Sequence, residues 1–246
     1  MNRKDIAFRP LRQAVYSVRS FASTSPALYL AFARRRYRDV PDRVVETDTE
    51  LVIEGFQRSG NTFSVIAFEV AQPRQVKTAH HLHAAAQIVE AVRLGVPTIV
   101  LIREPRGSVL SHMVREPGIS ASQALTAWVR FYERILPLRD RVVVADFREV
   151  TTDVGAVIAR VNERYGTAFA EFDHTPDEVA RVFALIEDRN RIRYGTVSET
   201  TVPRPSTERD ERKEALRSQF QADRLARLRD RASIVYRSLV PSATVT

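Results

Sequence analysis

The sequence predicts an α/β fold of three layers, in which helices cover both faces of a central parallel sheet. Short, continuously apolar segments are typical of strands buried on both faces, and segments with helical spacing of apolar residues separate them. The chain has 246 residues, enough for one sizeable core but too few for two large domains. We therefore expect a basic N-terminal extension over residues 1–46, packed on or beside a single α/β domain over residues 47–246.

Four segments are expected to form the strands. Residues 98–102 are the clearest, because four of the five are isoleucine, valine or leucine. Pro105 follows closely, and this strand ends before it because proline cannot continue a central strand. The other strands are expected at residues 51–54, which Gly55 ends, at residues 75–79, and at residues 142–145, which Asp146 ends.

The helices are expected between and after these strands. Their apolar residues recur three or four positions apart, and Gly95 is a natural end for one of them. The expected helices span residues 62–70, 84–94, 109–114 and 125–136, and a charged helical tail spans residues 207–237.

Charge and composition narrow the range of functions. The formal net charge is +8, and all but three of the 38 cationic residues are arginine, whose planar fork suits phosphate or sulfate. The absence of cysteine excludes disulfides and thiolate metal sites. No apolar run approaches the roughly 20 residues of a membrane-spanning helix and no signal peptide is evident, so we expect a cytoplasmic protein. The arginines at residues 34–38 follow an apolar stretch, and this segment either packs on the domain or makes peripheral contact with a membrane.

A glycine-containing loop joins the first expected strand to the first expected helix. Ligands of parallel α/β sheets bind at the carboxyl ends of strands, where helix N-termini present N–H groups. Gly60 lets the backbone approach an anion, Arg58 supplies a charge, and Ser59 and Thr62 add hydroxyl donors. Asn61 stands where the phosphate loop of a nucleoside triphosphatase has lysine, so that class fits poorly. A simple turn that caps the helix is the alternative.

A second anion pocket is expected where the strand at residues 98–102 ends. Arg103 emerges at the same carboxyl edge as the glycine-containing loop, and Ser111 lies eight residues further on, in the next helix. A guanidinium and a hydroxyl at this turn can hold a second phosphate.

These two segments resemble the nucleotide-binding motifs of the sulfotransferases that use 3′-phosphoadenosine-5′-phosphosulfate (PAPS). The first motif corresponds to Gln57-Arg58-Ser59-Gly60-Asn61-Thr62-Phe63, and the second to Arg103 and Ser111. The resemblance covers residues 50–150 and is weak beyond them. It implies a P-loop-like fold and a metal-independent transfer of the sulfuryl group of PAPS to a hydroxyl of a carbohydrate, lipid or small-molecule alcohol.

The resemblance also implies roles for single residues. The residues from Arg58 to Phe63 would bind the 5′-phosphosulfate, and Arg103 and Ser111 the 3′-phosphate. Arg204, in the basic segment 204–209, would belong to a C-terminal phosphate-binding loop. Arg58 replaces the lysine of the family: it can stabilise developing negative charge in catalysis, but it cannot give up a proton.

Three of the five histidines, His80, His81 and His83, follow the second expected strand, and in an extended segment the last two share a face. The family's base lies in a similar stretch, so the resemblance implies that His81 takes the proton of the acceptor hydroxyl. His80 and His83 stay open as alternatives for the base. A zinc site and polar capping of the next helix are other interpretations of the cluster. His112 and His174 are expected at the surface or in loops.

Two other functions compete with the sulfotransferase hypothesis. Asp146 follows an apolar strand, like the magnesium-binding acid of a nucleotide kinase or NTPase. The positive charge suits nucleic acid, but aromatic residues make up only 8% and no nucleic-acid module is visible, so no such partner is expected. We expect acceptor contacts in the loops at residues 115–124 and 190–206. The oligomeric state does not follow from the sequence.

Overall fold

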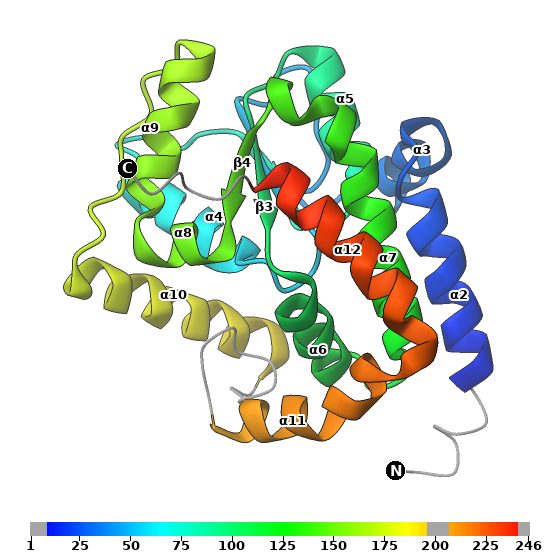
Figure 1. Cartoon of the computed structure of the whole chain (residues 1–246). Coiled ribbons are helices and arrows are strands. Elements are labelled where there is room, and N and C mark those ends of the chain that lie inside the picture. The colour runs from blue at the N-terminus through cyan, green and yellow to red at the C-terminus, as the bar shows by residue number, and fades with distance from the viewer. Residues whose placement is uncertain (1–8, 196–206, 241–246) are drawn as a thin grey trace.

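A computed structural model describes residues 9–195 and 207–240 of the chain. Four parallel strands form one sheet in the order β2–β1–β3–β4 (Figure 1). The strands are β1 (Leu51–Gly55), β2 (Thr78–His80), β3 (Thr98–Ile102) and β4 (Val143–Asp146). Helices lie on both faces of this sheet, which confirms the predicted three-layer α/β fold.

Two hydrophobic cores lie on opposite faces of the sheet, and β3 contributes to both. Its residues alternate, so Ile99 and Leu101 face one core while Val100 and Ile102 face the other. The first core includes α4 (Asn61–Ala71), α8 (Phe147–Thr152), α9 (Val154–Tyr165) and α10 (Pro176–Tyr194). The second includes α5 (Ala85–Leu94), α6 (Pro105–Arg115), α7 (Ala121–Ile135), the short helix η1 (Leu136–Arg141) and α12 (Ala226–Leu239).

Most of the predicted strands and helices lie close to observed ones, and the larger differences have local causes, whereas α8, α9 and α10 had no predicted counterpart. β2 begins at Thr78 instead of residue 75, because the N–H of Lys77 donates to the Glu50 carboxylate at 3.0 Å. α6 begins four residues earlier than expected. Pro105 occupies its first turn, and the Glu104 carboxylate accepts hydrogen bonds from the N–H groups that this turn leaves open.

The charged tail predicted as a single helix over residues 207–237 is two helices. α11 (Thr207–Gln221) and α12 are joined by the 3₁₀ turn η2 (Asp223–Leu225). The Arg229 guanidinium donates to the carbonyls of Phe220 and Ala222 at 2.8 and 2.9 Å, which satisfies backbone acceptors at the break. Phe220 and Leu225 are buried in the core at this corner, so apolar burial stabilises the bend.

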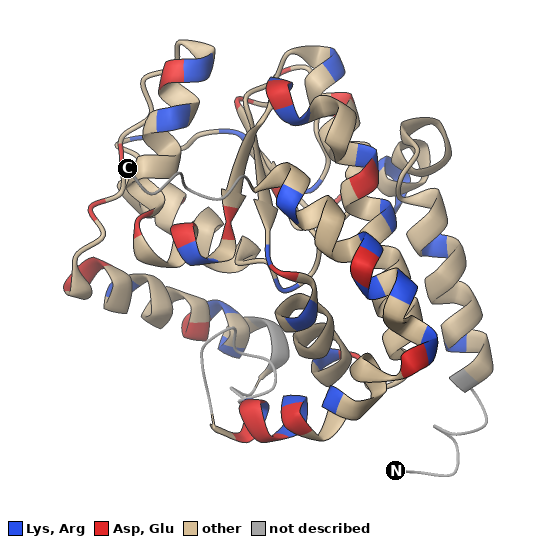
Figure 2. Cartoon of the chain, viewed as in Figure 1, with Lys and Arg blue, Asp and Glu red and all other residues tan. Residues whose placement is uncertain are grey.

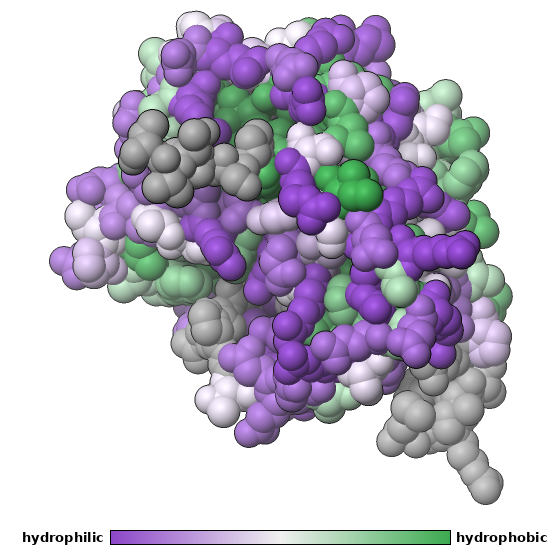
Figure 3. Space-filling view, viewed as in Figure 1, coloured by the Kyte–Doolittle hydropathy of each residue, from purple (hydrophilic) through white to green (hydrophobic). Residues whose placement is uncertain are grey.

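The N-terminal segment forms two helices that pack against the rest of the structure, α2 (Arg9–Ala22) and α3 (Pro26–Arg36). α2 lies along α7, where Gln13 Nε2 donates to the Gly118 carbonyl at 3.0 Å. α3 packs on α5 through a small apolar cluster that includes Leu30 and Ala33. The ribbon of α2 carries basic positions and no acidic ones (Figure 2), and hydrophobic atoms gather at the edge of the molecule over α2 and α3 (Figure 3). Within residues 9–195 and 207–240, no helix is long and apolar enough to cross a membrane.

His112 is a buried residue, so the expectation that it lies at the surface is wrong. Its side chain in α6 is 3% exposed, and its ring lies 5.7 Å from the ring of Tyr16 and 5.6 Å from that of Phe56. The Tyr16 hydroxyl is hydrogen-bonded to His112 Nε2 at 3.1 Å. Burial lowers the pKa of His112 to about 3. His174 lies in a loop, as expected.

We predict that His112 makes folding stability depend on pH. Because its pKa is lower in the folded state than the unfolded value of about 6.5, its contribution is complete above about pH 6.5 and is lost as the pH falls toward its folded pKa. Lowering the pH from about 6.5 to about 4.5 therefore reduces the free energy of unfolding of the wild type. In His112→Gln this loss of stability between the two pH values should be smaller by about 1–2 kcal/mol. Urea denaturation at the two pH values measures the difference.

Tyr16→Phe is the matched control, because it removes the hydrogen bond to His112 and leaves the titrating ring in place. It should lower stability by a similar amount at both pH values. A His112→Gln protein with the pH dependence of the wild type would contradict the prediction.

Candidate functional site

The loop between β1 and α4, residues 56–60, turns its backbone tightly around the N-terminus of α4. Arg58 and Gly60 have left-handed backbone conformations, with φ of 69° and 92°. A Cβ at Gly60 would lie 3.1 Å from Val150, so the position also lacks room for a side chain. Asn61 Nδ2 donates to the Phe56 carbonyl at 3.0 Å and closes the turn. A loop of this kind at a helix N-terminus is suited to binding an anion, and we call residues 56–60 the phosphate loop.

The hydroxyl of Tyr132, in α7, ties this loop to the sheet. It donates to the Leu101 carbonyl of β3 at 2.7 Å, accepts from the N–H of Phe56 at 3.3 Å and lies 3.2 Å from the Ser59 hydroxyl. Burial raises the pKa of Tyr132 well above its ordinary value, so the phenol keeps the proton that it donates. Tyr132 could not be identified from the sequence, because an aromatic residue in an amphipathic helix is typical of a core position.

The two predicted anion pockets lie together. Arg58 Nε donates to Ser111 Oγ at 2.9 Å, and Arg103 Nη1 donates to the Arg58 carbonyl at 3.4 Å. The Arg103 guanidinium also lies over the ring of Phe147, with its Cζ 4.0 Å from the ring centroid. Since β1 and β3 are neighbours in the sheet, the loop after β1 and the turn after β3 form one continuous site.

This site is strongly cationic. Burial, together with the charges of Arg209, Arg115 and Arg103, lowers the pKa of Arg58 to about 9. Among the described residues, the hydrogen bond of the Arg58 side chain goes to a neutral hydroxyl, that of Ser111. Burial also lowers the pKa of Arg103. A bound anion would relieve the repulsion between these guanidinium groups, so the site is electrostatically complementary to phosphate or sulfate.

The segment 204–209 was expected to form a C-terminal phosphate-binding loop, and the structure describes residues 207–209 of it. Arg204 lies outside the described residues. Arg209, at the beginning of α11, is 4% exposed and its charge lowers the pKa of Arg58. α11 packs against α6, the helix that carries Ser111. Arg209 therefore brings positive charge to the site from the beginning of α11.

The remaining residues of the loop motif differ in accessibility. Ser59, Asn61 and Phe63 are buried, and their side chains shape the loop and the core beneath it. The ring of Phe63 packs 5.5 Å from the ring of Phe183 in α10. The first N–H groups of α4 have no acceptor within the helix and are the loop's donors for an anion. Thr62 differs from these three residues, because its hydroxyl contacts His81.

The histidines after β2 lie beside the loop, but they do not form an extended segment. His81 and His83 have left-handed backbone conformations, with φ of 58° and 53°, so the expected sharing of a strand face is wrong. His81 Nε2 lies 3.2 Å from Thr62 Oγ1, and its Nδ1 lies 2.7 Å from Nδ1 of His80. Arg43 Nη1 donates to the His81 carbonyl at 2.6 Å, which helps to hold the turn.

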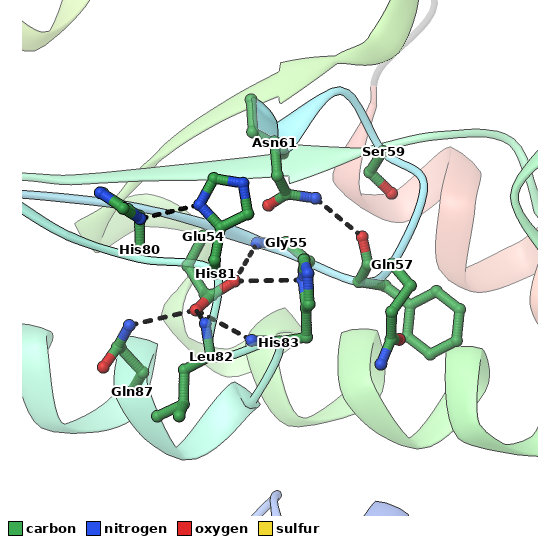
Figure 4. A network of polar contacts seen from close by, with 12 residues as sticks. Glu54, Gly55, Gln57, Ser59, Asn61, His80, His81, Leu82, His83 and Gln87 are labelled. Carbon is green, nitrogen blue, oxygen red and sulfur yellow. Dashed lines mark hydrogen bonds and ion pairs between the residues drawn. The ribbon is translucent and has the colours of Figure 1, made fainter. Parts of the chain in front are cut away.

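A buried carboxylate fixes this histidine turn to the sheet (Figure 4). The Glu54 side chain in β1 accepts hydrogen bonds from the N–H groups of Gly55, Leu82 and His83 and from Gln87 Nε2, at 2.9–3.1 Å. Burial raises the pKa of Glu54 to about 7, although the N–H donors favour its charged form. Because β1 continues directly into the phosphate loop, Glu54 sets the separation between that loop and the histidines.

His80 and His83 are neutral at physiological pH. Burial is the main cause that lowers the pKa of each to about 4. His83 Nδ1 lies 2.9 Å from the Gly55 carbonyl, so this nitrogen carries the proton and donates. This hydrogen bond of the His83 imidazole therefore stabilises the end of β1.

Two cavities reach the histidine turn. The larger, about 650 Å³, runs beside the edge strand β2, and its lining includes His80, Glu69 and Arg189. The smaller, about 40 Å³, lies between α2, α7 and the phosphate loop, and its lining includes His83 and Gln57. The phosphate loop and the larger cavity are connected through the chain of contacts from Thr62 to the histidines.

The kinase and zinc interpretations find no support in the geometry. Asp146 caps α8: one carboxylate oxygen accepts from the N–H of Arg148 at 2.9 Å and the other from the Tyr236 hydroxyl at 2.6 Å. Both oxygens therefore have protein donors. In the described part of the chain, no group of three or more His, Asp or Glu side chains is arranged to hold a metal ion, so the histidine cluster offers no zinc ligand set there.

We predict that Tyr132→Phe destabilises the protein by about 1–3 kcal/mol, because it leaves the buried N–H of Phe56 and the carbonyl of Leu101 without this hydroxyl. Tyr165→Phe is the matched control: its hydroxyl donates to the Arg141 carbonyl at an exposed position and its loss should cost less than about 1 kcal/mol. Urea denaturation compares the two. Equal losses would show that Tyr132 does not anchor the loop.

Comparison with known proteins adds a likeness to a solved structure. No protein-family model and no curated protein matches the chain. Among solved structures, mouse sulfotransferase SULT7A1 complexed with PAP is similar, with 14% sequence identity and a TM-score of 0.38, over 78% of this chain and 90% of that chain. A likeness at this level says nothing about activity or substrate, which depend on the residues of the site.

Proposed function

We propose that the protein is a sulfotransferase that uses PAPS. The observation that carries the proposal is that two groups suited to anion binding lie in contact at the carboxyl edge of the sheet. Arg58 donates a hydrogen bond to Ser111, and Arg103 donates one to the Arg58 carbonyl. PAPS has a phosphosulfate at its 5′ position and a phosphate at its 3′ position, so two adjoining anion pockets suit it. The loop has Asn61 where a nucleoside triphosphatase has lysine, which disfavours that class.

The residues present fit this donor by charge and hydrogen-bonding capacity. Arg58 and the first N–H groups of α4 would hold the 5′-phosphosulfate, and Arg103 and Ser111 would hold the 3′-phosphate. Arg209 adds positive charge from α11. The lowered pKa of Arg58 supports this fit, because it means that the free site destabilises the charged guanidinium. A bound anion would stabilise that charge.

The chemistry requires a proton acceptor and a stabilised leaving group. PAPS supplies an activated sulfuryl group, whose sulfur gains a bond to the acceptor oxygen as its bond to the 5′-phosphate oxygen breaks. We assign to His81 Nε2 the acceptance of the hydroxyl proton, since this atom lies beside Thr62 of the phosphate loop. Arg58 would stabilise negative charge on the sulfonyl oxygens and on the leaving phosphate without moving a proton.

His80 would give His81 the tautomer that a base requires. Their Nδ1 atoms are 2.7 Å apart, so one donates to the other. When His81 Nδ1 donates, its Nε2 carries the lone pair that takes the proton. Burial lowers the pKa of His80 to about 4, which keeps it a neutral acceptor for this bond. We therefore assign His80 a positioning role and His81 the catalytic one.

The acceptor would approach through the larger cavity beside β2. His80 lines this cavity, and charged and amide side chains surround it, among them Glu69, Gln72 and Arg189. A hydrophilic hydroxyl compound such as a carbohydrate matches this lining better than an apolar alcohol. Acceptor contacts by the loops at residues 115–124 and 190–206 stay a prediction; in the first of them, Gly118 accepts a hydrogen bond from Gln13 of α2.

We predict that adenosine 3′,5′-bisphosphate binds without metal, with a Kd of micromolar order. Arg58→Ala and Arg103→Ala should each weaken binding at least tenfold, because each removes a charge from the joined pockets. Arg181→Ala, an exposed arginine of α10, is the control and should bind like the wild type. Isothermal titration calorimetry measures all four proteins.

Unchanged affinity in both pocket variants would overturn the site assignment. Binding of ATP that requires magnesium, with no binding of the bisphosphate, would favour the kinase alternative.

We predict that His81→Gln binds adenosine 3′,5′-bisphosphate within about threefold of the wild type and loses at least about a hundredfold in sulfuryl transfer. The reason is that glutamine keeps a polar contact to Thr62 but cannot take up a proton at neutral pH. Transfer of labelled sulfate from PAPS to a panel of carbohydrates measures the effect. His174→Gln, in a loop, is the control, and full transfer by His81→Gln would remove His81 from the mechanism.

A further inference from the structure

The outward side of α2 and α3 is unusually apolar. The described residues include nine large apolar side chains that are highly exposed, and six of them lie on these two helices. They are Leu11, Val15, Val18, Phe21, Leu28 and Phe32, and we call them, with the arginines Arg12, Arg34, Arg35 and Arg36, which are exposed, the α2–α3 surface. Single exposed apolar residues are ordinary, but a concentration of this kind marks an interaction surface.

The exposed residues follow the helical period, so they form stripes. On α2, Leu11, Val15 and Val18 are four and three positions apart and are 58–68% exposed. On α3, Leu28 and Phe32 are four positions apart and are 62% and 59% exposed. In Figure 3 hydrophobic atoms lie along the edge of the molecule over both helices. The inner side of each helix packs on the domain, so these apolar stripes stay exposed to solvent in the folded protein.

The charged residues of α2 and α3 are all arginines, one of which, Arg34, lies 3.8 Å from the Glu90 carboxylate of α5. Residues 9–38 contain seven arginines and no aspartate or glutamate. Residues 1–46 contain ten cationic and four anionic residues, so they carry +6 of the chain's net charge of +8. Figure 2 shows the contrast, since acidic positions are interspersed with basic ones on α11 and α12 but absent from α2. The last turn of α3 is Arg34-Arg35-Arg36.

We propose that the α2–α3 surface binds an anionic lipid membrane, lying in the plane of the headgroups. Apolar stripes flanked by arginines match an interface in which acyl chains receive the apolar side chains and lipid phosphates receive the guanidinium groups. A second copy of the chain fits less well, because a symmetric dimer would bring two basic faces together. A nucleic acid would match the charge but would leave the apolar stripes exposed to water.

The position of α2 links this surface to the proposed active site. The inner side of α2 lines the smaller cavity, where Tyr16, Arg19 and Ser20 lie across from His83. One helix, about 10 Å across, therefore separates the bound lipid surface from the histidine turn. Tyr16 also holds α2 to His112, so the surface is presented on a packed helix.

The test is sedimentation of the full chain with vesicles of two compositions, one of phosphatidylcholine alone and one of phosphatidylcholine and phosphatidylglycerol in equal parts. The wild type should bind the anionic vesicles at least tenfold more tightly, and raising the salt from about 0.1 M to about 0.5 M should weaken that binding. Val18→Ser/Phe32→Ser should weaken it about tenfold, because two apolar contacts with the acyl region are lost. Arg34→Gln/Arg35→Gln/Arg36→Gln should weaken it at least tenfold.

Matched controls remove the same chemistry from another face. Ile234→Ser removes an exposed apolar side chain of α12, and Arg224→Gln/Arg227→Gln/Arg237→Gln removes three exposed arginines. Both should bind vesicles like the wild type, and circular dichroism melting curves should show that all variants fold. Equal binding to the two vesicle types, or equal losses in the controls, would overturn the proposal. So would a dimer in analytical ultracentrifugation that the α2–α3 variants dissociate, without vesicle binding.

Discussion

The buried carboxylate of Glu54 is the constraint on which the site depends. It lies in β1, one residue before Gly55, and accepts hydrogen bonds from the backbone of the histidine turn and from Gln87 of α5. A buried acid is unfavourable unless its oxygens are satisfied, and here four N–H donors satisfy them. The turn that carries His81 is thereby held beside the strand that leads into the phosphate loop. The histidine turn and the loop at residues 56–60 come from separate segments, and this one side chain links them.

The arginine cluster has an energetic cost in the free protein. Arg58 is partly buried, and its desolvation together with the charges of Arg209, Arg115 and Arg103 lowers its pKa. A bound anion can offset this cost, because a ligand that binds only the folded state stabilises it by mass action. The N-terminal helices concentrate positive charge as well, but at the surface and among exposed apolar side chains. The chain therefore has two kinds of basic region, one partly buried at the candidate site and one exposed on the N-terminal helices.

Sequence reasoning identified the phosphate loop and Arg103 because both follow strands of a parallel sheet, and strand ends in such a sheet share an edge. It placed His81 beside the loop only through a family resemblance, and it gave the histidine turn the wrong backbone conformation. It missed Tyr132, whose hydroxyl meets Ser59 from 73 positions away. It also placed His112 at the surface, because nothing near His112 in sequence indicates that Tyr16, 96 positions away, closes over it.

The sequence by itself determined the alternation of strands and helices, the loop chemistry and the basic, apolar N-terminal segment. These are properties of short windows, where periodicity, glycine and proline act on neighbouring residues. Only the tertiary structure decided that Arg58 meets Ser111, 53 positions apart, that Arg209 joins them from α11, and that the stripes of α2 and α3 face outward. The physical reason is that burial and pairing depend on which distant segments pack together. A local sequence pattern does not reveal which segments pack together, because the free energy of the whole core determines it.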